Sequence, residues 1–195
     1  MLDHKGTRFY GLNYKCPCDC VFCVRKNYDS LTTEGSLWLE HEPELSEIIN
    51  ELKKRDLSKY DEAVFCGYGE PLVRIDTLIE VCKYIRSVSS IKIRINTNGL
   101  SDLIHQKPTA HLLSGLVDSI SISLNAPSAD EYLKITNPEF GIESFQSLLN
   151  FAQASKKVIG DVYFSVVDIL TEEQILRCKE ISERMNIPLK IRHKA

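Results

Sequence analysis

Three cysteines near the start of the chain have the type and spacing that suggest chemistry. Cys16, Cys20 and Cys23 follow the pattern C-x3-C-x2-C. Three thiolates this close together cannot share one regular element, but they can fold around an inorganic centre, and iron-sulfur clusters are normally held by cysteine thiolates. Three ligands leave one iron of a four-iron cluster open. An open iron can bind a small molecule through its heteroatoms.

Two other uses of these cysteines have to be weighed. Cys18 lies between Cys16 and Cys20, and four sulfurs would suit tetrahedral zinc, although structural zinc sites more often use two separated pairs. A disulfide framework is disfavoured, because the chain shows no secretory segment and has an odd total of seven cysteines. We therefore interpret Cys18 as a loop thiol beside the three cluster ligands.

Further polar motifs follow in a fixed order along the chain. Residues 67–71 read Gly-Tyr-Gly-Glu-Pro, residues 96–99 read Asn-Thr-Asn-Gly, and residues 123–125 read Ser-Leu-Asn. With Phe22 directly before the last cysteine, this series resembles the signature of the radical S-adenosylmethionine (radical SAM) superfamily. Tyr68 stands where that superfamily more often has a second glycine.

The resemblance implies two cofactors, a 4Fe-4S cluster on Cys16, Cys20 and Cys23, and SAM chelating the fourth iron. One electron then cleaves SAM to a 5′-deoxyadenosyl radical, which abstracts hydrogen from a substrate. The implied cofactor contacts are Phe22, Gly67, Tyr68, Gly69, Glu70, Asn96, Asn98, Ser123, Asn125, Val167 and Arg192. Glu70 would take the methionine ammonium. The implied partner is a low-potential electron donor such as flavodoxin or ferredoxin.

Within the superfamily, the motifs resemble those of small radical SAM proteins associated with TatD-family hydrolases. This implies a TatD-family hydrolase as a partner and names no substrate. The absence of further cysteine clusters disfavours an oxidation that relies on a second cluster. Two alternatives stay open: an activase-type enzyme that acts on a partner protein, and a non-catalytic iron-sulfur or zinc protein.

Length and composition place limits on the fold and on the partners. The 195 residues, 43% of them hydrophobic, are enough for one domain spanning residues 1–195 with a sizeable core. A net charge of -3 argues against a protein that relies on bulk positive charge to bind nucleic acid. Because we find neither a run of about 18 apolar residues nor a signal-peptide pattern in residues 1–15, we expect a soluble cytoplasmic protein.

Strand-like and helix-like segments alternate along the chain. The predicted strands are residues 8–14, 63–66, 91–95, 117–124, 162–167 and 188–192. The predicted helices are residues 42–54, 75–85, 108–116, a segment starting at Ser128, 143–156 and 175–185, with capping boxes at Ser128/Glu131 and Thr171/Gln174. This alternation favours an α/β fold of parallel βαβ units. Six strands are too few for an eight-stranded barrel, and the resemblance implies a partial (β/α)6 barrel, a radical SAM core without large extensions.

Side-chain alternation predicts a polar inner face for this barrel. Ile93 and Ile95 share one face of their strand with Ile91, so Lys92, Arg94 and Asn96 must share the other. Ser119, Ser121, Ser123, Lys190 and Arg192 fall on the corresponding face of later strands. Buried charge is costly unless it is paired, so we predict an anionic or polar substrate near Lys92 and Arg94. The alternative is that this face lies on the exposed surface.

One loop is a candidate lid over the predicted site. Residues 136–141 contain Pro138 and Gly141 between two helical segments. We hypothesise that this loop moves to close the mouth of the barrel.

Overall fold

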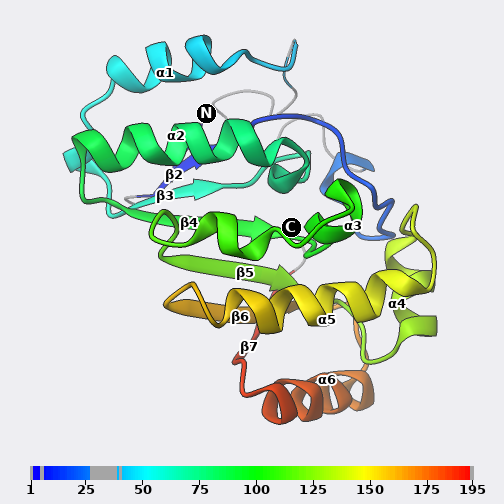
Figure 1. Ribbon diagram of the computed structural model, residues 1–195. Coiled ribbons are helices and arrows are strands. Elements are labelled where there is room, and N and C mark those ends of the chain that lie inside the picture. The colour runs from blue at the N-terminus through cyan, green and yellow to red at the C-terminus, as the bar shows by residue number, and fades with distance from the viewer. Residues whose placement is uncertain (1, 5–6, 27–38, 40, 194–195) are drawn as a thin grey trace.

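The computed structural model describes residues 2–4, 7–26, 39 and 41–193 (Figure 1). Within these described residues seven strands form one sheet, in which the strand order follows the sequence. The strands are β1 (Leu2–His4), β2 (Thr7–Tyr10), β3 (Glu62–Phe65), β4 (Lys92–Thr97), β5 (Ser119–Ser123), β6 (Asp161–Val167) and β7 (Leu189–Arg192).

Strands β2 to β7 are parallel, which confirms the predicted parallel sheet, whereas β1 pairs antiparallel with β2 and was not expected. The first parallel strand ends at Tyr10, four residues before the predicted boundary. Residues 11–15 leave the sheet and carry the chain toward the cysteines. Within the described part of the chain β7 does not pair with β1, so the sheet is a partial barrel.

Helices cover one face of the sheet (Figure 1). The α-helices are α1 (Leu45–Lys53), α2 (Ile75–Val88), α3 (Ser101–His105), α4 (Ala129–Thr136), α5 (Glu143–Ser155) and α6 (Glu172–Met185). The described residues also form four short 3-10 helices: η1 (Val24–Lys26), η2 (Leu57–Lys59), η3 (Pro71–Arg74) and η4 (Ala110–Leu113).

The helix starts follow their capping residues. Thr171 and Gln174 form the predicted capping box of α6. The Ser128 hydroxyl accepts from the Glu131 N–H and so caps α4 as predicted, but the Glu131 carboxylate binds the Ser128 hydroxyl rather than its backbone. The predicted helix 108–116 is wrong. α3 lies before this segment and ends where Gln106 adopts a left-handed φ of 53°, and only the short η4 forms within it.

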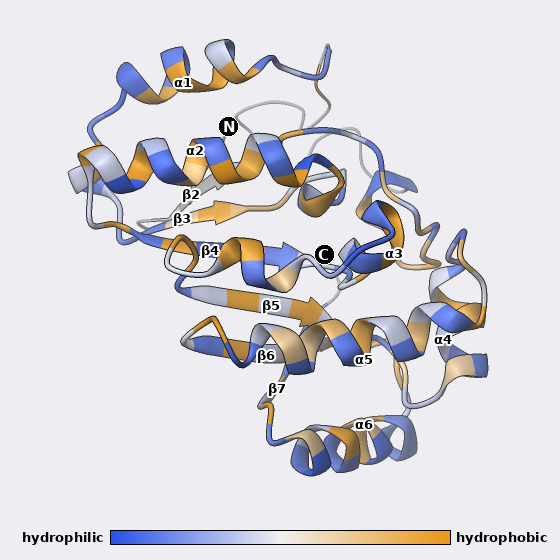
Figure 2. Cartoon of the chain, in the orientation of Figure 1, coloured by the Kyte–Doolittle hydropathy of each residue, from blue (hydrophilic) through white to orange (hydrophobic). Residues whose placement is uncertain are grey.

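The hydrophobic core lies between the sheet and its helices. Ile93, Ile95, Ile120 and Ile122 are fully buried there, and Figure 2 shows apolar patches on the covering helices. The isoleucine faces of β4 and β5 are thus as predicted. The opposite face carries the polar residues.

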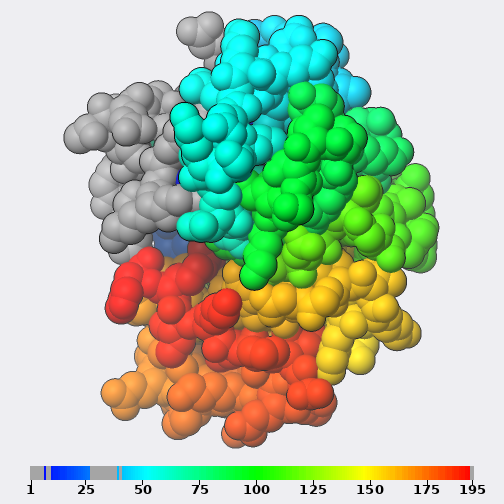
Figure 3. Space-filling view, turned by 90° about the vertical axis from the view of Figure 1, so that its left-hand side faces the viewer, coloured from blue at the N-terminus to red at the C-terminus, as the bar shows by residue number. Residues whose placement is uncertain are grey.

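That polar face is partly enclosed and partly open. Ser121 and Ser165 are buried on it, whereas Lys92 and Lys190 are exposed. β7 is an edge strand with exposed residues, and in Figure 3 the red carboxyl-terminal part of the chain lies at the surface. None of the helices in the described segments has the length and apolar character needed to cross a membrane.

Candidate cofactor site

The cysteine loop is braced by residues 135–139. The Asp19 and Val21 N–H groups donate to the carbonyls of Thr136 and Ile135, each at 2.9 Å, and the Glu139 N–H donates to the Pro17 carbonyl at 2.8 Å. Cys18 and Pro138 form an antiparallel bridge between these bonds. The lid hypothesis is therefore wrong in its premise: the segment around Pro138 is bonded to the cysteine loop and holds it.

The three predicted cluster ligands are chemically available. Cys16, Cys20 and Cys23 are free thiols and half-buried, whereas Cys18 is buried in the core. A hydrogen bond from the Cys18 thiol lowers the pKa of Cys16, while burial raises the pKa of Cys23. Free, half-buried thiols on one loop are the donor set of a 4Fe-4S cluster, so these residues fit that group.

The thiols do not converge on a point that a single ion would occupy. Across the segments that the structure describes, no three His, Cys, Asp or Glu side chains form a group able to hold one metal ion. In a 4Fe-4S cluster each cysteine ligates a different iron, so its ligand set is spread over the cluster.

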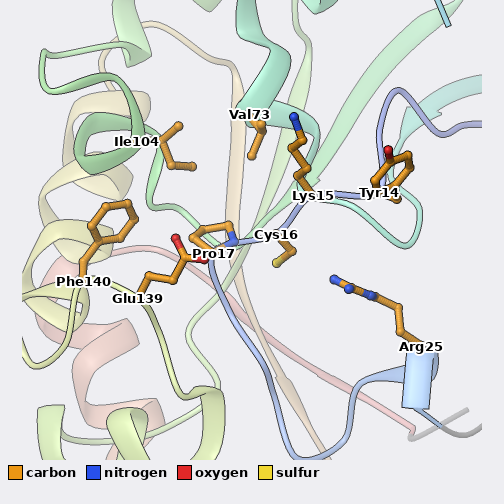
Figure 4. Close-up of a pocket in the computed structure, with 9 residues that line it drawn as sticks. All are labelled: Tyr14, Lys15, Cys16, Pro17, Arg25, Val73, Ile104, Glu139 and Phe140. Carbon is orange, nitrogen blue, oxygen red and sulfur yellow. The ribbon is translucent and has the colours of Figure 1, made fainter. Parts of the chain in front are cut away.

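A groove of about 520 Å³ opens beside Cys16 (Figure 4). Its lining residues are Tyr14, Lys15, Cys16, Pro17, Arg25, Val73, Ile104, Glu139 and Phe140. Figure 4 shows the Arg25 guanidinium extending from η1 toward Cys16. The charge of Arg25 helps to lower the pKa of Cys16 and opposes the burial effect at Cys23, so it favours thiolates in this loop.

The Gly-Tyr-Gly-Glu-Pro segment is locked against the residues before Cys16. The Glu70 N–H donates to the Lys15 carbonyl at 2.8 Å, and Asn13 Nδ2 donates to the Glu70 carbonyl at 2.9 Å. A Cβ atom added at Gly69 would lie 2.2 Å from Asn13 Oδ1, so only glycine allows this approach. Asn13 is a site residue that the sequence interpretation missed. Its signal was an asparagine, a poor strand former, inside a predicted strand.

The Glu70 carboxylate joins two loops. Its Oε1 accepts from the Leu72 N–H at 3.0 Å and the Thr97 hydroxyl at 2.7 Å, and its Oε2 accepts from the Asn98 N–H at 2.7 Å. Thr97 was not among the predicted site residues. An ionised carboxylate offers about four acceptor sites, so three bonds leave room for one more donor.

Glu70 is buried without a cation. It is 4% exposed, and no described Lys or Arg forms an ion pair with it. Burial raises the pKa of Glu70 to about 6, while the bonds from Asn98, Thr97 and Leu72 act in the opposite direction. The predicted role of Glu70 as the acceptor of a ligand ammonium stays a prediction that this geometry allows.

The two asparagines of the Asn-Thr-Asn-Gly segment have different neighbours, cysteine sulfurs for one and an arginine for the other. Asn98 Nδ2 lies 3.9 Å from Cys16 Sγ and 3.7 Å from Cys18 Sγ. Asn96 Oδ1 instead accepts from Arg94 at 2.7 Å. Of the two, only Asn98 is brought to the cysteine loop by a side-chain bond in the described structure.

The remaining predicted contacts lie at or near the carboxyl ends of the strands, except Phe22, which lies in the cysteine loop. Asn125 follows β5 with a left-handed φ of 55°, and its buried Oδ1 has no hydrogen-bond partner among the described residues. A ligand hydroxyl could donate a hydrogen bond to this unpaired buried acceptor. The other positions are Phe22, Gly67, Tyr68, Ser123, Val167 and Arg192, with Tyr68 buried and Val167 paired in register with Arg192.

The two predicted substrate residues lie in the amino-terminal half of β4, away from the site at the carboxyl ends of the strands. Lys92 is exposed at the amino end of β4, about 16 Å from the strand's other end at roughly 3.3 Å per residue. Arg94 forms an ion pair with Glu62 at 2.9 Å, and its Nη1 lies 3.4 Å from the Tyr163 hydroxyl. The premise that Arg94 lacks a protein partner is therefore wrong, and Lys92 is not brought to the site.

Basic side chains of β7 remain on the polar face. Lys190 Nζ lies 3.4 Å from the centre of the Tyr163 ring, a cation–π contact. Arg192 makes no side-chain hydrogen bond or ion pair within the described part of the chain. Arg192 is exposed on the edge strand, but part of its side chain is desolvated, which lowers its pKa, and the nearby Tyr163, Cys20 and Cys66 act against that effect. The charge of Arg192 is thus felt both by Tyr163 on the polar face and by Cys20 of the cysteine loop.

Comparisons with known proteins identify a family and several relatives of this chain. The family model described as "Radical SAM superfamily" matches residues 11–176. Dual-specificity RNA methyltransferase RlmN of Wigglesworthia glossinidia brevipalpis is 28% identical over 198 residues, covering 90% of this chain and 48% of the relative. GTP 3′,8-cyclase of Lactiplantibacillus plantarum is 30% identical over 154 residues, covering 78% of this chain and 42% of the relative.

The fold itself recurs in solved structures. Streptococcus suis SuiB bound to precursor peptide SuiA matches with a TM-score of 0.72 at 16% identity, covering 97% of this chain and 39% of that one. At this identity the match shows the fold alone. The chain spans about half the length of the curated relatives it matches. From the family match over most of its length, the chain belongs to the Radical SAM superfamily, whose enzymes use a 4Fe-4S cluster and S-adenosylmethionine.

Proposed function

We propose that the chain is a radical SAM enzyme that binds its cluster through Cys16, Cys20 and Cys23 and abstracts hydrogen from a polar or anionic substrate. The observation that supports this most is the joining of three motif loops at one edge of a parallel sheet. Glu70 connects the Lys15 carbonyl, directly before Cys16, to the Asn98 amide. The carboxyl edge of a parallel sheet is where such folds bind ligands.

When bound, the cluster and SAM supply one-electron cleavage of SAM and a carbon radical that takes hydrogen from the substrate. The chain's part is to bind and orient. The free acceptor site of Glu70 suits the methionine ammonium of SAM, and the unpartnered Asn125 Oδ1 suits a ribose hydroxyl. Arg25 favours the thiolate form of the cysteine loop.

The polar face of the sheet supports the proposed substrate class. Ser121 and Ser165 are buried on it, and Lys190 and Arg192 add two positive charges on β7. Because Arg94 is already neutralised by Glu62, we now assign the anion preference to Lys190 and Arg192. A polar or anionic substrate would pair with these cations and hydroxyls.

The partners and location belong to the same proposal. We infer a low-potential electron donor such as flavodoxin or ferredoxin, because the cluster must receive one electron before it can cleave SAM. All seven cysteines are free, which fits a reducing compartment such as the cytoplasm. A TatD-family hydrolase stays a prediction from the sequence motifs, and no contact in the structure bears on it.

The test is anaerobic reconstitution with iron and sulfide, followed by SAM and a low-potential reductant. The readout is 5′-deoxyadenosine by mass spectrometry, with Cys20→Ala as the control. We expect product from the parent protein and none from the variant. A parent protein that retains neither iron nor SAM would overturn the proposal and favour a non-catalytic protein.

A further inference from the structure

We propose that the Asn98 side chain donates a hydrogen bond to a cluster-ligating sulfur and thereby makes the cluster easier to reduce. The inference rests on the proposed function, in which Cys16 is a cluster ligand. It assigns Asn98 to the cluster, whereas the sequence motif implied a contact with SAM. Asn98 would act through the sulfur, as a tuning residue rather than a catalytic one.

The distances bring one amide group to two sulfurs. Asn98 Nδ2 lies 3.9 Å from Cys16 Sγ and 3.7 Å from Cys18 Sγ, and both contacts are partly shielded from solvent. The amide orientation is set by its other atom, because Oδ1 accepts from the Leu100 N–H at 2.9 Å. Rotating the amide would lose that bond and turn an oxygen toward the sulfurs. The NH2 group is therefore the end that faces Cys16.

The backbone of Asn98 is also tied to the loop that carries the sulfur. Its N–H donates to Glu70 Oε2 at 2.7 Å, and the Glu70 N–H donates to the Lys15 carbonyl at 2.8 Å. Lys15 directly precedes Cys16, so a closed circuit of bonds runs from the sulfur through Lys15, Glu70 and Asn98 back to the sulfur. Such a circuit holds the donor in place before any cofactor binds.

The physical consequence is a shift in reduction potential. Adding an electron makes the cluster and its thiolates more negative, and an N–H group aimed at a ligand sulfur stabilises that added charge. Hydrogen bonds to the sulfurs are among the factors that set cluster potentials. Asn98 is neutral, so it favours the reduced state without changing the net charge of the site. This matters for an enzyme that must accept an electron from a donor of limited strength.

The experiment measures the midpoint potential of the reconstituted cluster by an EPR-monitored redox titration, before SAM is added. The variants are Asn98→Ser and Asn98→Ala. A serine hydroxyl can accept the Leu100 N–H as asparagine does, but it is too short to bring a donor to the sulfurs. We expect both variants to keep their iron and sulfide and to show a more negative potential than the parent protein.

Asn96→Ser is the matched control, because it removes the same amide two residues earlier on β4, where the side chain is bonded to Arg94. We expect it to leave the potential in the absence of SAM unchanged. An equal shift in Asn96→Ser would overturn the inference. So would an unchanged potential in Asn98→Ser, and if SAM also bound more weakly there, Asn98 would be a SAM contact instead.

Failure of the proposed function would look different. Cys16→Ser should lose iron from the reconstituted cluster if Cys16 is a ligand. A complete cluster in that variant would remove the basis of the proposed function, whatever the potentials of the Asn98 variants. An incomplete cluster in Cys16→Ser together with unchanged potentials in the Asn98 variants would overturn only the inference about Asn98.

Discussion

Two glutamates near opposite ends of β3, Glu62 half-buried and Glu70 buried, stabilise a carboxylate in different ways. Glu62, at the amino end of β3, pairs with Arg94 at 2.9 Å. Glu70, beyond the carboxyl end of β3, accepts three bonds from neutral groups and has no cation among the described residues. The negative charge of Glu62 is therefore neutralised by a cation within the protein. Within the described structure, the negative charge of Glu70 is stabilised only by hydrogen bonds from neutral groups.

The difference between the paired Glu62 and the unpaired Glu70 indicates where a cationic ligand would bind. A buried charge is costly, and a partner of opposite charge offsets much of that cost. The Glu62–Arg94 pair has its partner and gives no reason to infer a ligand. The raised pKa of Glu70 reflects burial that its three donors do not fully compensate, so a cationic ligand such as the SAM ammonium would gain from binding there.

The largest expected effect comes from Gly69→Ala, which adds one carbon directly before Glu70. In Gly69→Ala the new Cβ would lie 2.2 Å from Asn13 Oδ1 and 2.3 Å from the Asn13 carbonyl oxygen, so backbone must move. We expect a loss of about 3 kcal/mol in unfolding free energy, the upper range for overpacking, together with at least a tenfold weaker affinity for SAM. Urea unfolding and calorimetric binding of SAM measure the two effects.

Gly160→Ala is the control, because its nearest neighbour is the Asp118 carbonyl oxygen at 3.8 Å, an ordinary contact. We expect it to stay within about 0.5 kcal/mol of the parent protein. Equal stability of the two variants would show that the approach of Gly69 to Asn13 is not tight.

A single substitution tests whether residues 135–139 brace the cysteine loop. Gly141 donates to the Pro138 carbonyl at 3.0 Å, so Glu139 occupies the second position of a turn, where proline is favoured. Glu139→Pro therefore fits the turn and removes the N–H that donates to Pro17. We expect a loss of about 2 kcal/mol, as for a buried carbonyl left without its donor, and a lower iron content after reconstitution.

Glu139→Ala keeps the N–H and should match the parent protein in unfolding free energy. If the segment were a lid, Glu139→Pro would change substrate affinity and leave the iron content intact.

The pH dependence of stability separates the two glutamates directly. The pKa of Glu70 rises from 4.5 to about 6 on folding, so between these values the folded protein binds more protons than the unfolded chain. The contribution of Glu70 to the free energy of unfolding is fully present below pH 4.5 and is lost as the pH rises through 6. At about 1.36 kcal/mol for each unit of pKa shift, the free energy of unfolding falls by about 2 kcal/mol. Urea unfolding of the apoprotein across this range should show the fall in the parent protein and in Glu62→Gln. Its persistence in Glu70→Gln would assign the pH dependence to another group.

Much of this molecule could be predicted from local patterns. The alternation of Ile93 and Ile95 with Arg94 is a property of one strand, and it identified both faces of β4 correctly. The Thr171/Gln174 capping box needs only four residues, and it marked the start of α6. The family motifs also follow from the sequence alone, because their spacing is local within each loop.

What could not be predicted depends on contacts between distant segments. The brace between Pro17 and Glu139 uses backbone groups, which leave no pattern in the side chains, so Pro138 suggested a hinge. The pairing of Glu62 with Arg94 depends on the register of β3 against β4. Without the register, Arg94 looked like a buried charge in need of a ligand.

The smallest expected effect is at the balanced pair. Glu62→Gln leaves Arg94 without a charged partner, but the side chains of Glu62 and Arg94 are 23% and 21% exposed, and the amide oxygen of glutamine can still accept from Arg94. Breaking a fully buried pair costs about 3 to 5 kcal/mol, so with water access and a retained bond we expect about 1 kcal/mol. A double-mutant cycle with Arg94→Gln, measured by urea unfolding, isolates the coupling between the two side chains. SAM affinity and the yield of 5′-deoxyadenosine should stay at the level of the parent protein. If Glu62→Gln instead weakens SAM binding as strongly as Gly69→Ala does, the pair is part of the cofactor site, and the contrast between balanced and unbalanced charge no longer marks where the ligand binds.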